Sequence, residues 1–386
     1  NLFLIADCAE SLGATYKKFE KNTLGDVSAF SFFGNKMITT GEDIPTVSDS
    51  SVYYNRGKNK SRTEAMRDFH NKYVKNKLIT SVSNPGNTLI DLAVGKAGDI
   101  AKWRTNKLSF ILGVDVSEDN IENKQDGACV RFIEDYNKYK TDMRALFIIG
   151  NSKNNFKKGE GLRSQKDKII YNAVVGVGPN SEKQLGAGVK AQYGKAVNGF
   201  DVASCQFALH YFFENVGTLN NFLQNVSHCT KVGGFFIGAC YDGEKLFKDL
   251  SKKEIKEGIS LFKNDNKIWE IIKQYSNTDF NNDESSVGYA IDVYQETIGK
   301  MFREYLVNFT YLTRLMENYG FVLLSKEEAN SIFSEIDNRI YFISEENQNK
   351  VSISFDPNSS VSVNYENQGK VVSGSHNNGG QVIINI

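Results

Sequence analysis

The chain has 386 residues, of which 40% are hydrophobic and 12% aromatic, enough to fill the core of one large domain or two modest ones. Lysine plus arginine and aspartate plus glutamate each number 46, so the formal net charge is zero. A protein that grips long nucleic acid through many phosphates is normally more basic. We therefore expect any nucleic-acid partner to be held locally.

Cysteine usage and hydropathy indicate the cellular compartment of the protein. The five cysteines are scattered and lack Cys-x-x-Cys spacing, which argues against disulfides and structural zinc; they are Cys8, Cys129, Cys205, Cys229 and Cys240. No run of about 18 apolar residues occurs, so no membrane span and no membrane partner are predicted. The chain starts at Asn1 without a basic and apolar leader, which is typical of a fragment or a processed chain. We expect an intracellular, cytoplasmic protein without a metal site.

Three segments of different character follow one another. Residues 1–45 form the first, which ends in the linker-like sequence GEDIPTVSDSS. Residues 50–345 alternate short apolar runs with amphipathic stretches, and include a polar, glycine-rich stretch at 154–198 that we interpret as a surface insertion. Residues 346–386 are rich in Ser, Asn and Gly with alternating Val and Ile, which predicts hairpins or a flexible tail.

The middle segment contains five short apolar runs that are typical of buried strands. In chain order they are TLIDLAVG, LSFILGVDVS, RALFIIGNS, FDVASCQFA and GGFFIGACY. Helical stretches separate them, and this alternation predicts an α/β fold with a doubly wound, mostly parallel sheet.

The end of the first run has the features of a cofactor-binding turn. A strand at Leu89–Val94 precedes Gly95 and Gly98, and a helix is predicted from about Asp99. Glycines in such a turn let backbone approach a ligand, although they also serve tight packing. Asp115 ends the second strand, where an acid can hold a ribose diol. Because the full GxGxxG pattern is missing, an adenosine cofactor without a pyrophosphate, such as S-adenosylmethionine, fits better than a dinucleotide.

These motifs resemble a known family. DLAVGKAGD resembles the DLGCGKGGD loop of mRNA cap guanine-N7 methyltransferases, and FDVASCQFALHYFFEN is similar to their FDICSCQFxxHYxFE signature. Three further blocks match in order: YYNRGKNKSRTEAMRDFHNKYVKNKLI, KVGGFFIGACYDG and FREYLVNFTYLTRLMENYGFVLL. The resemblance covers roughly 53–345 and is greatest to capping enzymes of large DNA viruses. It implies a Rossmann-like class I fold that uses S-adenosylmethionine.

The resemblance also implies two sets of site residues. The expected cofactor-binding residues are Asn71, Lys75, Asp91, Gly95, Lys96, Gly98, Asp115, Asn151 and Gln206. The expected guanine-binding residues are His210, Tyr211, Glu304 and, on a shorter match, Tyr341. A core histidine at His210 and ordinary solvated helix charges at Lys75 and Glu304 are the alternatives. Guanine N7 carries a free lone pair and no proton, so we expect alignment of the reactants and no catalytic acid or base.

The cofactor turn departs from the family pattern. Ala93 and Val94 stand where the family commonly has Gly and Cys, and Ala97 replaces a Gly. Asn151 stands in place of an acid near the adenine. The added methyl groups would narrow the cofactor space. An alternative prediction is therefore a cap-binding or scaffold module that no longer holds the methyl donor.

Two other motifs suggest different chemistry. KQDG at 124–127 satisfies the KxDG nucleotidyl-lysine motif of guanylyltransferases, but its companion blocks are absent, so Lys124 is expected to be a loop lysine. Residues 5–42 resemble pyridoxal-phosphate sugar aminotransferases of the perosamine-synthetase type. That resemblance implies Asp7 at the pyridine nitrogen, Ser31 at the phosphate and Lys36 as the Schiff-base lysine. Such an enzyme needs a whole domain, so we interpret the segment as a fusion remnant or a strand-helix addition and expect no pyridoxal phosphate.

The predicted function is methyl transfer from S-adenosylmethionine to N7 of the guanine of an RNA 5′ cap. The implied partners are a capped RNA 5′ end and other capping-enzyme domains. For a viral protein, the implied location is the host cytoplasm or the virion.

Overall fold

The structure is a computed structural model of the whole chain. It describes residues 68–325 except 264, 297 and 298, together with Glu328 and the backbone of five strands outside that range. Those strands are β1 (Leu2–Asp7), β11 (Tyr341–Ile343), β12 (Lys350–Asp356), β13 (Ser360–Asn367) and β14 (Lys370–Asn377).

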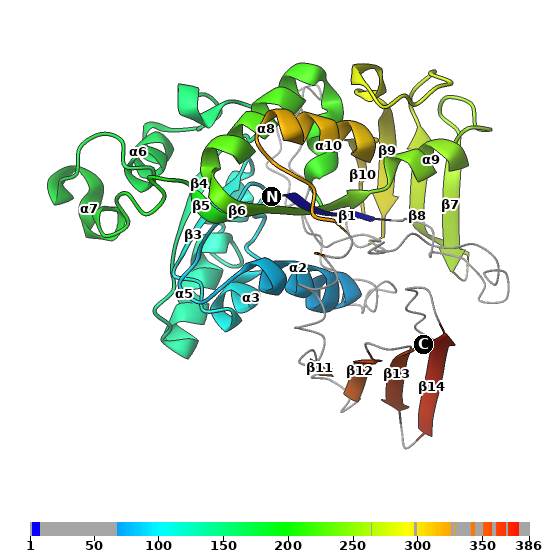
Figure 1. Cartoon of the computed structure of the whole chain (residues 1–386), viewed down its shortest axis with the longest axis horizontal. Helices are drawn as coiled ribbons and strands as arrows, with labels where there is room; N and C mark the ends of the chain where they lie inside the picture. Colours follow the sequence, from blue (N-terminus) through cyan, green and yellow to red (C-terminus); the bar gives the residue numbers. More distant parts are fainter. Residues whose placement is uncertain are drawn as a thin grey trace.

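A six-stranded sheet in the order β1-β6-β5-β2-β3-β4 forms the centre of the molecule (Figure 1). Every neighbouring pair of its strands is parallel. Besides β1, the strands are β2 (Thr88–Asp91), β3 (Phe110–Asp115), β4 (Arg144–Ile149), β5 (Phe200–Gln206) and β6 (Thr230–Tyr241). The chain adds β3 and β4 on one side of β2, then β5 and β6 on the other. The switch point therefore lies between β2 and β5, where doubly wound sheets bind ligands.

The five predicted apolar runs coincide with β2 to β6. All six residues of β3 are buried, as expected of a parallel strand with helices on both faces. The first strand ends earlier than predicted, at Asp91, because Leu92 to Val94 already belong to the turn. The prediction of a doubly wound, mostly parallel sheet is confirmed.

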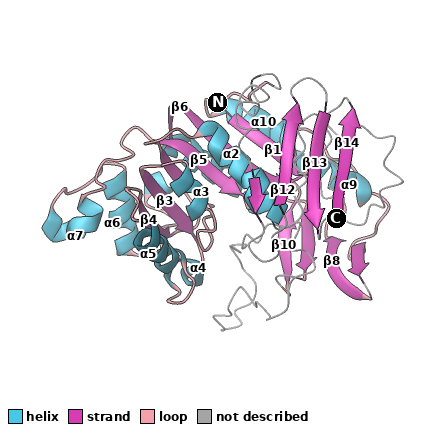
Figure 2. Cartoon of the chain, turned by 90° about the horizontal axis from the view of Figure 1, so that it is seen from below, coloured by secondary structure: helices cyan, strands magenta, loops and turns pink. Residues whose placement is uncertain are grey.

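Helices cover both faces of the sheet (Figures 1 and 2). One apolar cluster joins α2, α3 and α5 to the sheet through residues such as Leu78, Trp103 and Ala128. The other joins α6, α8 and α10 through residues such as Phe222 and Leu312. The helices of the described part are α2 (Lys75–Val82), α3 (Ile100–Thr105), α4 (Glu118–Glu122), α5 (Ala128–Tyr139), α6 (Gln165–Val174), α7 (Glu182–Lys190), α8 (Val216–Cys229), α9 (Gly243–Asp249) and α10 (Phe309–Asn318).

A second, antiparallel sheet follows β6 in the chain and has the order β10-β9-β8-β7. Its strands are β7 (Gly258–Lys263), β8 (Asn266–Lys273), β9 (Ala290–Gln295) and β10 (Met301–Tyr305). Gly288 N donates to Phe213 O over 2.9 Å, which ties this sheet to the segment after β5. Short helical turns complete the described part: the π-helix η3 (Phe69–Val74) and the 3₁₀ helices η4 (Phe156–Lys158), η5 (Leu209–Glu214) and η6 (Glu284–Ser286).

The first segment, the glycine-rich stretch and the C-terminal segment each add strands or helices to the central sheet. The first segment contributes β1, which lies at the edge of the sheet beside β6. Within 154–198, α6 packs into the core through Ile170 and Val174, whereas α7 has no buried residue. Only part of that stretch is therefore a surface insertion. Strands β11 to β14 form an antiparallel sheet. Of the two predictions for the C-terminal segment, hairpins or a flexible tail, these strands correspond to the hairpins.

Candidate functional site

The turn after β2 lies at the carboxyl edge of the sheet. Leu92 N donates to Ser204 O and Val94 N to Val114 O, each over 2.9 Å, so the turn stays between β5 and β3. Gly95 adopts φ +55°, the left-handed region that favours glycine. A Cβ atom added at Gly95 or Gly98 would meet no atom within 4 Å. The outer side of the turn is therefore open enough for a ligand to approach the backbone.

Asp115 holds this turn from the end of β3. Its Oδ2 accepts from Gly95 N over 2.7 Å, and its Oδ1 accepts from Ser117 N and Asn120 Nδ2, each over 3.0 Å. The carboxylate is buried, and these bonds fix its orientation. The predicted pair of Gly95 and Asp115 is thus brought together.

Lys75 and Asn71 come from the helical segment that precedes β2. Asn71 lies on η3, and π-helical turns often occur at functional sites. Lys75 is buried, with its Nζ 3.4 Å from Asp99 Oδ2 and 5.7 Å from the ring centroid of Phe207. Phe207 itself has φ +58°, an outlier for a bulky residue and a form of strain that clusters at active sites. No pattern in the sequence predicts this strain.

One pocket joins residues from both predicted sets. It is small and partly open to solvent, and its walls come from the segments that directly follow β2, β3 and β4 and from η5. Its lining residues are Leu92, Val116, Gly150, Asn151, Ser152, Lys153, Tyr211 and Phe212. Asn151 was predicted at the cofactor and Tyr211 at the guanine. The two predicted subsites are therefore adjacent.

A buried polar cluster lies behind this pocket. Tyr211 Oη donates to Glu304 Oε1 over 3.1 Å, and His210 Nε2 lies 3.6 Å from Glu304 Oε2. The rings of His210 and Tyr211 meet edge to face, with centroids 4.2 Å apart. Glu304 comes from β10 of the second sheet, 93 residues after Tyr211. Because Glu304 is only 1% exposed, it is not an ordinary solvated charge.

Burial changes the protonation of this cluster. It raises the pKa of Glu304 to about 8, even though the hydrogen bond from Tyr211 acts to lower it. It lowers the pKa of His210 to about 3, so the imidazole is neutral near pH 7. Several buried polar atoms of the described part have no hydrogen-bond partner there, and four of them lie in this cluster or at the end of β5: Gln206 Oε1, His210 Nδ1, His210 Nε2 and Glu304 Oε2. Buried polar groups are normally satisfied, so these four atoms are candidates for contact with a ligand.

The altered residues of the turn pack into the apolar core. Ala93 belongs to the cluster beneath α6, α8 and α10, whereas Val94 and Ala97 belong to the cluster beneath α2, α3 and α5. All three side chains are buried. Their methyl groups therefore contribute to the packing of the turn against the helices.

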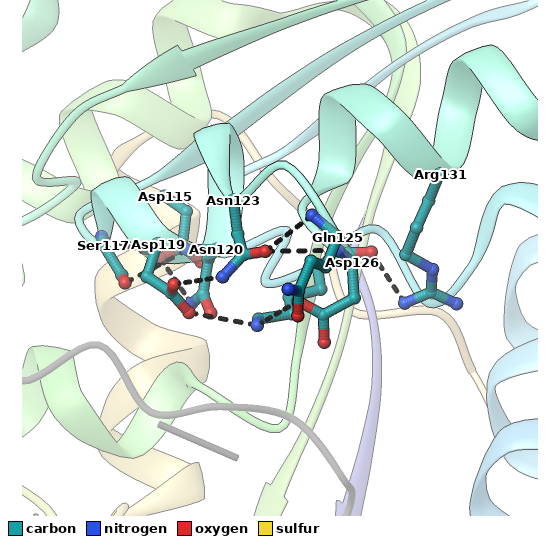
Figure 3. A network of polar contacts seen from close by, with 9 residues as sticks. Asp115, Ser117, Asp119, Asn120, Asn123, Gln125, Asp126 and Arg131 are labelled. Carbon is teal, nitrogen blue, oxygen red and sulfur yellow. Dashed lines mark hydrogen bonds and ion pairs between the residues drawn. The ribbon is translucent and has the colours of Figure 1, made fainter. Parts of the chain in front are cut away.

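The Lys96 side chain pairs with Asp119 and Asp126, two acids of the segment between β3 and α5 that Figure 3 labels. Its Nζ lies 2.6 Å from Asp126 Oδ1 and 3.0 Å from Asp119 Oδ2. Partial burial acts to raise the pKa of Asp119, but hydrogen bonds from Asn123 and Lys96 lower it below its ordinary value. Lys124, in the same turn as Asp126, is exposed, as expected of a loop lysine. Sequence reasoning considered KQDG only as a misleading motif and missed the role of its aspartate.

Some predicted residues cannot be placed. The structure describes only the backbone of Tyr341 in β11 and of Asp7 in β1. Ser31 and Lys36 lie outside the described residues. Asp91 ends β2, and its Oδ1 accepts from Ala93 N over 3.1 Å, so it shapes the turn from within.

Three kinds of feature are absent from the part of the chain that the structure describes. No group of three or more His, Cys, Asp and Glu side chains there could hold a metal ion. No helix of that part is long and apolar enough to cross a membrane. The cysteines placed there, Cys129, Cys205, Cys229 and Cys240, are not in disulfides.

The parallel sheet, its strand order and the glycine turn beside Asp115 define a Rossmann-like class I fold of S-adenosylmethionine-dependent methyltransferases. Residues 49–363 match the model of the mRNA (guanine-N(7))-methyltransferase domain. The chain belongs to this family. Residues 1–55 match the DegT/DnrJ/EryC1/StrS aminotransferase family, which covers only this short N-terminal part.

Similar proteins include viral and fungal enzymes. A probable mRNA-capping enzyme of Acanthamoeba polyphaga mimivirus is 27% identical over 82% of this chain and 26% of its own length. The mRNA cap guanine-N(7) methyltransferase of Candida glabrata is 29% identical over 72% of this chain and 57% of its own. This chain therefore spans about a quarter of the first relative and little more than half of the second.

Two further comparisons concern the N-terminal segment and solved structures. GDP-perosamine synthase of Escherichia coli O157:H7 is 54% identical over 56 residues, which are 14% of this chain and 15% of that protein. A solved S-adenosylmethionine-dependent methyltransferase from Clostridium acetobutylicum covers 64% of this chain and 75% of its own, with 14% identity and a TM-score of 0.35. The family assignment rests on the family match.

Proposed function

We propose that this chain transfers a methyl group from S-adenosylmethionine to N7 of the guanine of an RNA 5′ cap. The observation that carries the proposal is the set of buried, unpartnered polar atoms on His210 and Glu304, next to a pocket that Tyr211 shares with Asn151. This arrangement can accept a purine edge on one side and an adenosine cofactor on the other.

The residues around the turn suit the cofactor. Gly95 and Asp115 offer an open backbone and a fixed carboxylate for a ribose. Asn71 and Lys75 would meet the amino-acid end, and Asn151 the adenine, with Gln206 near the reacting centre. S-adenosylmethionine, when bound, supplies a methyl group on an already activated sulfonium.

The guanine side supplies recognition and alignment. An ionised Glu304 can accept from guanine N1–H and the exocyclic amine, and the neutral imidazole of His210 can donate or accept one hydrogen bond. In the transfer, the N7 lone pair forms the bond to carbon and the carbon–sulfur pair returns to sulfur, so no proton moves. The task of the protein is to hold the two partners in line and to exclude water. The product is cationic, which favours the ring face of Tyr211 and the carboxylate of Glu304.

The proposal extends to partners and location. The substrate is a guanylated RNA 5′ end, so a guanylyl-transfer reaction must come before this one. We place that reaction in other capping-enzyme domains and the protein in the cytoplasm, for a virus the host cytoplasm or the virion. We propose no bound pyridoxal phosphate for the N-terminal segment.

The first prediction is the activity itself. Incubation with labelled S-adenosylmethionine and a GpppA-ended RNA should yield 7-methylguanosine. His210→Ala and Glu304→Ala should each lower the rate by about tenfold or more, because each loses a hydrogen bond to a buried polar group. Lys124→Ala, on the exposed lysine of KQDG, is the matched control and should keep the wild-type rate. Equal rates in all four proteins would refute the guanine pocket.

A further inference from the structure

Ala97 has an unusual backbone conformation at the centre of the cofactor turn. Its φ is +53°, and its side chain is fully buried among Val94, Ile100 and Trp103. Residues with a Cβ atom are strained in the left-handed region, where glycine is at ease. Left alone, a turn with alanine at this position would favour other backbone conformations.

Three contacts hold the two residues immediately before Ala97. Gly95 N donates to Asp115 Oδ2 over 2.7 Å, from the end of β3. The Lys96 ammonium lies between Asp119 Oδ2 and Asp126 Oδ1, at 3.0 and 2.6 Å. Arg131 Nη1, on α5, donates to Lys96 O over 2.8 Å. The segment from β3 to α5 therefore contacts both the backbone and the side chain of the turn, through four residues that Figure 3 labels: Asp115, Asp119, Asp126 and Arg131.

We propose that Asp119, Asp126 and Arg131 act as a clamp on Lys96, which keeps the strained turn in its cofactor-binding conformation. These are positioning residues, and the inference rests on the proposed cofactor. The Lys96 side chain is 3% exposed, whereas those of Asp119 and Asp126 are 33% and 42% exposed. Ion pairs with such exposed carboxylates add little to global stability. The effect of the clamp should therefore appear in the turn.

The effect of weakening the clamp on the Kd for S-adenosylmethionine should depend on whether residue 97 is strained. If the turn reaches its binding conformation only part of the time, the apparent Kd rises by the inverse of that fraction. Asp126→Asn weakens the clamp while Asp119 still pairs with the buried Lys96. In the protein with alanine at 97, we expect Asp126→Asn to raise the Kd for S-adenosylmethionine by about tenfold. In the Ala97→Gly background, the same substitution should raise the Kd by about twofold or less, because glycine adopts positive and negative φ about equally.

Calorimetry with S-adenosylmethionine and S-adenosylhomocysteine tests this cycle in four proteins: wild type, Asp126→Asn, Ala97→Gly and the double variant. Glu122→Gln is the matched control, because it removes an exposed pair with Lys166 from the same segment without touching the turn. Its Kd should equal that of wild type. The proposal is wrong if Asp126→Asn leaves the Kd unchanged. It is also wrong if Asp126→Asn raises the Kd equally with alanine and with glycine at position 97.

Amide hydrogen exchange without cofactor gives a second readout. Asp126→Asn should speed exchange of the amides at 95–98, and less so together with Ala97→Gly, while thermal unfolding shifts little. If wild type binds neither ligand, the proposed function fails, and the clamp is then judged on exchange alone. Unaltered exchange at 95–98 in Asp126→Asn would exclude it.

Discussion

The carboxyl group of Glu304 is buried, and burial disfavours its ionised form. Burial holds its pKa at about 8, above an ordinary value of 4.5. His210 on η5 is neutral, and Tyr211 donates the hydrogen bond that favours ionisation. Tyr241 of β6 is the other ring beside this cluster, with its centroid 5.7 Å from that of His210. If Glu304 accepts a guanine edge as proposed, stability and recognition place opposite demands on it, because that edge needs the carboxylate that the folded protein disfavours.

This conflict predicts a pH effect on stability. Since the folded-state pKa of Glu304 is raised, its contribution is fully present below pH 4.5 and is lost as the pH rises through about 8. Glu304→Gln removes that titration. The melting temperature of wild type should therefore fall more between pH 7 and 9 than that of the variant. Parallel melting curves, measured by calorimetry, would mean that Glu304 is not buried as described. The lowered pKa of His210 acts only below about pH 6.5 and does not interfere.

At the scale of elements, the proposed guanine subsite depends on how the second sheet docks onto the first. Glu304 reaches His210 only because β10 lies beside η5. The segment after β10 is fixed at the start of α9, where a Cβ added at Gly243 would lie 2.2 Å from Val307 O. A close backbone approach of this kind sets the position of β10 and excludes any side chain at 243.

Gly243→Ala should therefore force Val307 and β10 to shift. We expect a loss of about 1–3 kcal/mol in the free energy of unfolding, the usual cost of overpacking, together with reduced methyl transfer. Gly188→Ala is the control, because a Cβ at this site in α7 meets no atom within 4 Å. It should be neutral or stabilise by about 0.5–1 kcal/mol. Urea titration measures both, and equal stabilities would contradict the described contact.

At the scale of the whole molecule, a short aminotransferase-like segment precedes a methyltransferase domain. The backbone of β1 extends the sheet at β6, whereas the described site residues come from the segment between η3 and β10. Nothing in the proposed chemistry requires the first 45 residues. β1 covers the edge of β6, and proteins normally protect exposed strand edges against pairing with other chains.

Removal of residues 1–45 should leave S-adenosylmethionine binding and methyl transfer within about twofold of the full chain, and should increase self-association through the uncovered edge of β6. Calorimetry and size-exclusion chromatography measure the two effects. Pyridoxal phosphate added to the full chain should give no aldimine absorbance band. Loss of cofactor binding on truncation would show that the segment belongs to the site.

Much of the fold and part of the site could be predicted from local pattern. Asp91 and Asp115 could be placed because each follows an apolar run, and the carboxyl ends of parallel strands meet at one edge. His210 and Glu304 were paired only through a family resemblance, since 94 positions separate them in the sequence. The partners of Lys96 were missed, because no periodicity connects a turn to an acid 30 residues later.

The sequence by itself determined five strands of the central sheet, their parallel arrangement and the glycine turn, because burial of apolar runs and backbone freedom are properties of short segments. Only the tertiary structure decided which polar atoms meet, which remain without partners and which carboxyl group holds its proton. Those properties depend on distance and desolvation between residues far apart in the chain, and these exist only once the two sheets and their helices have packed.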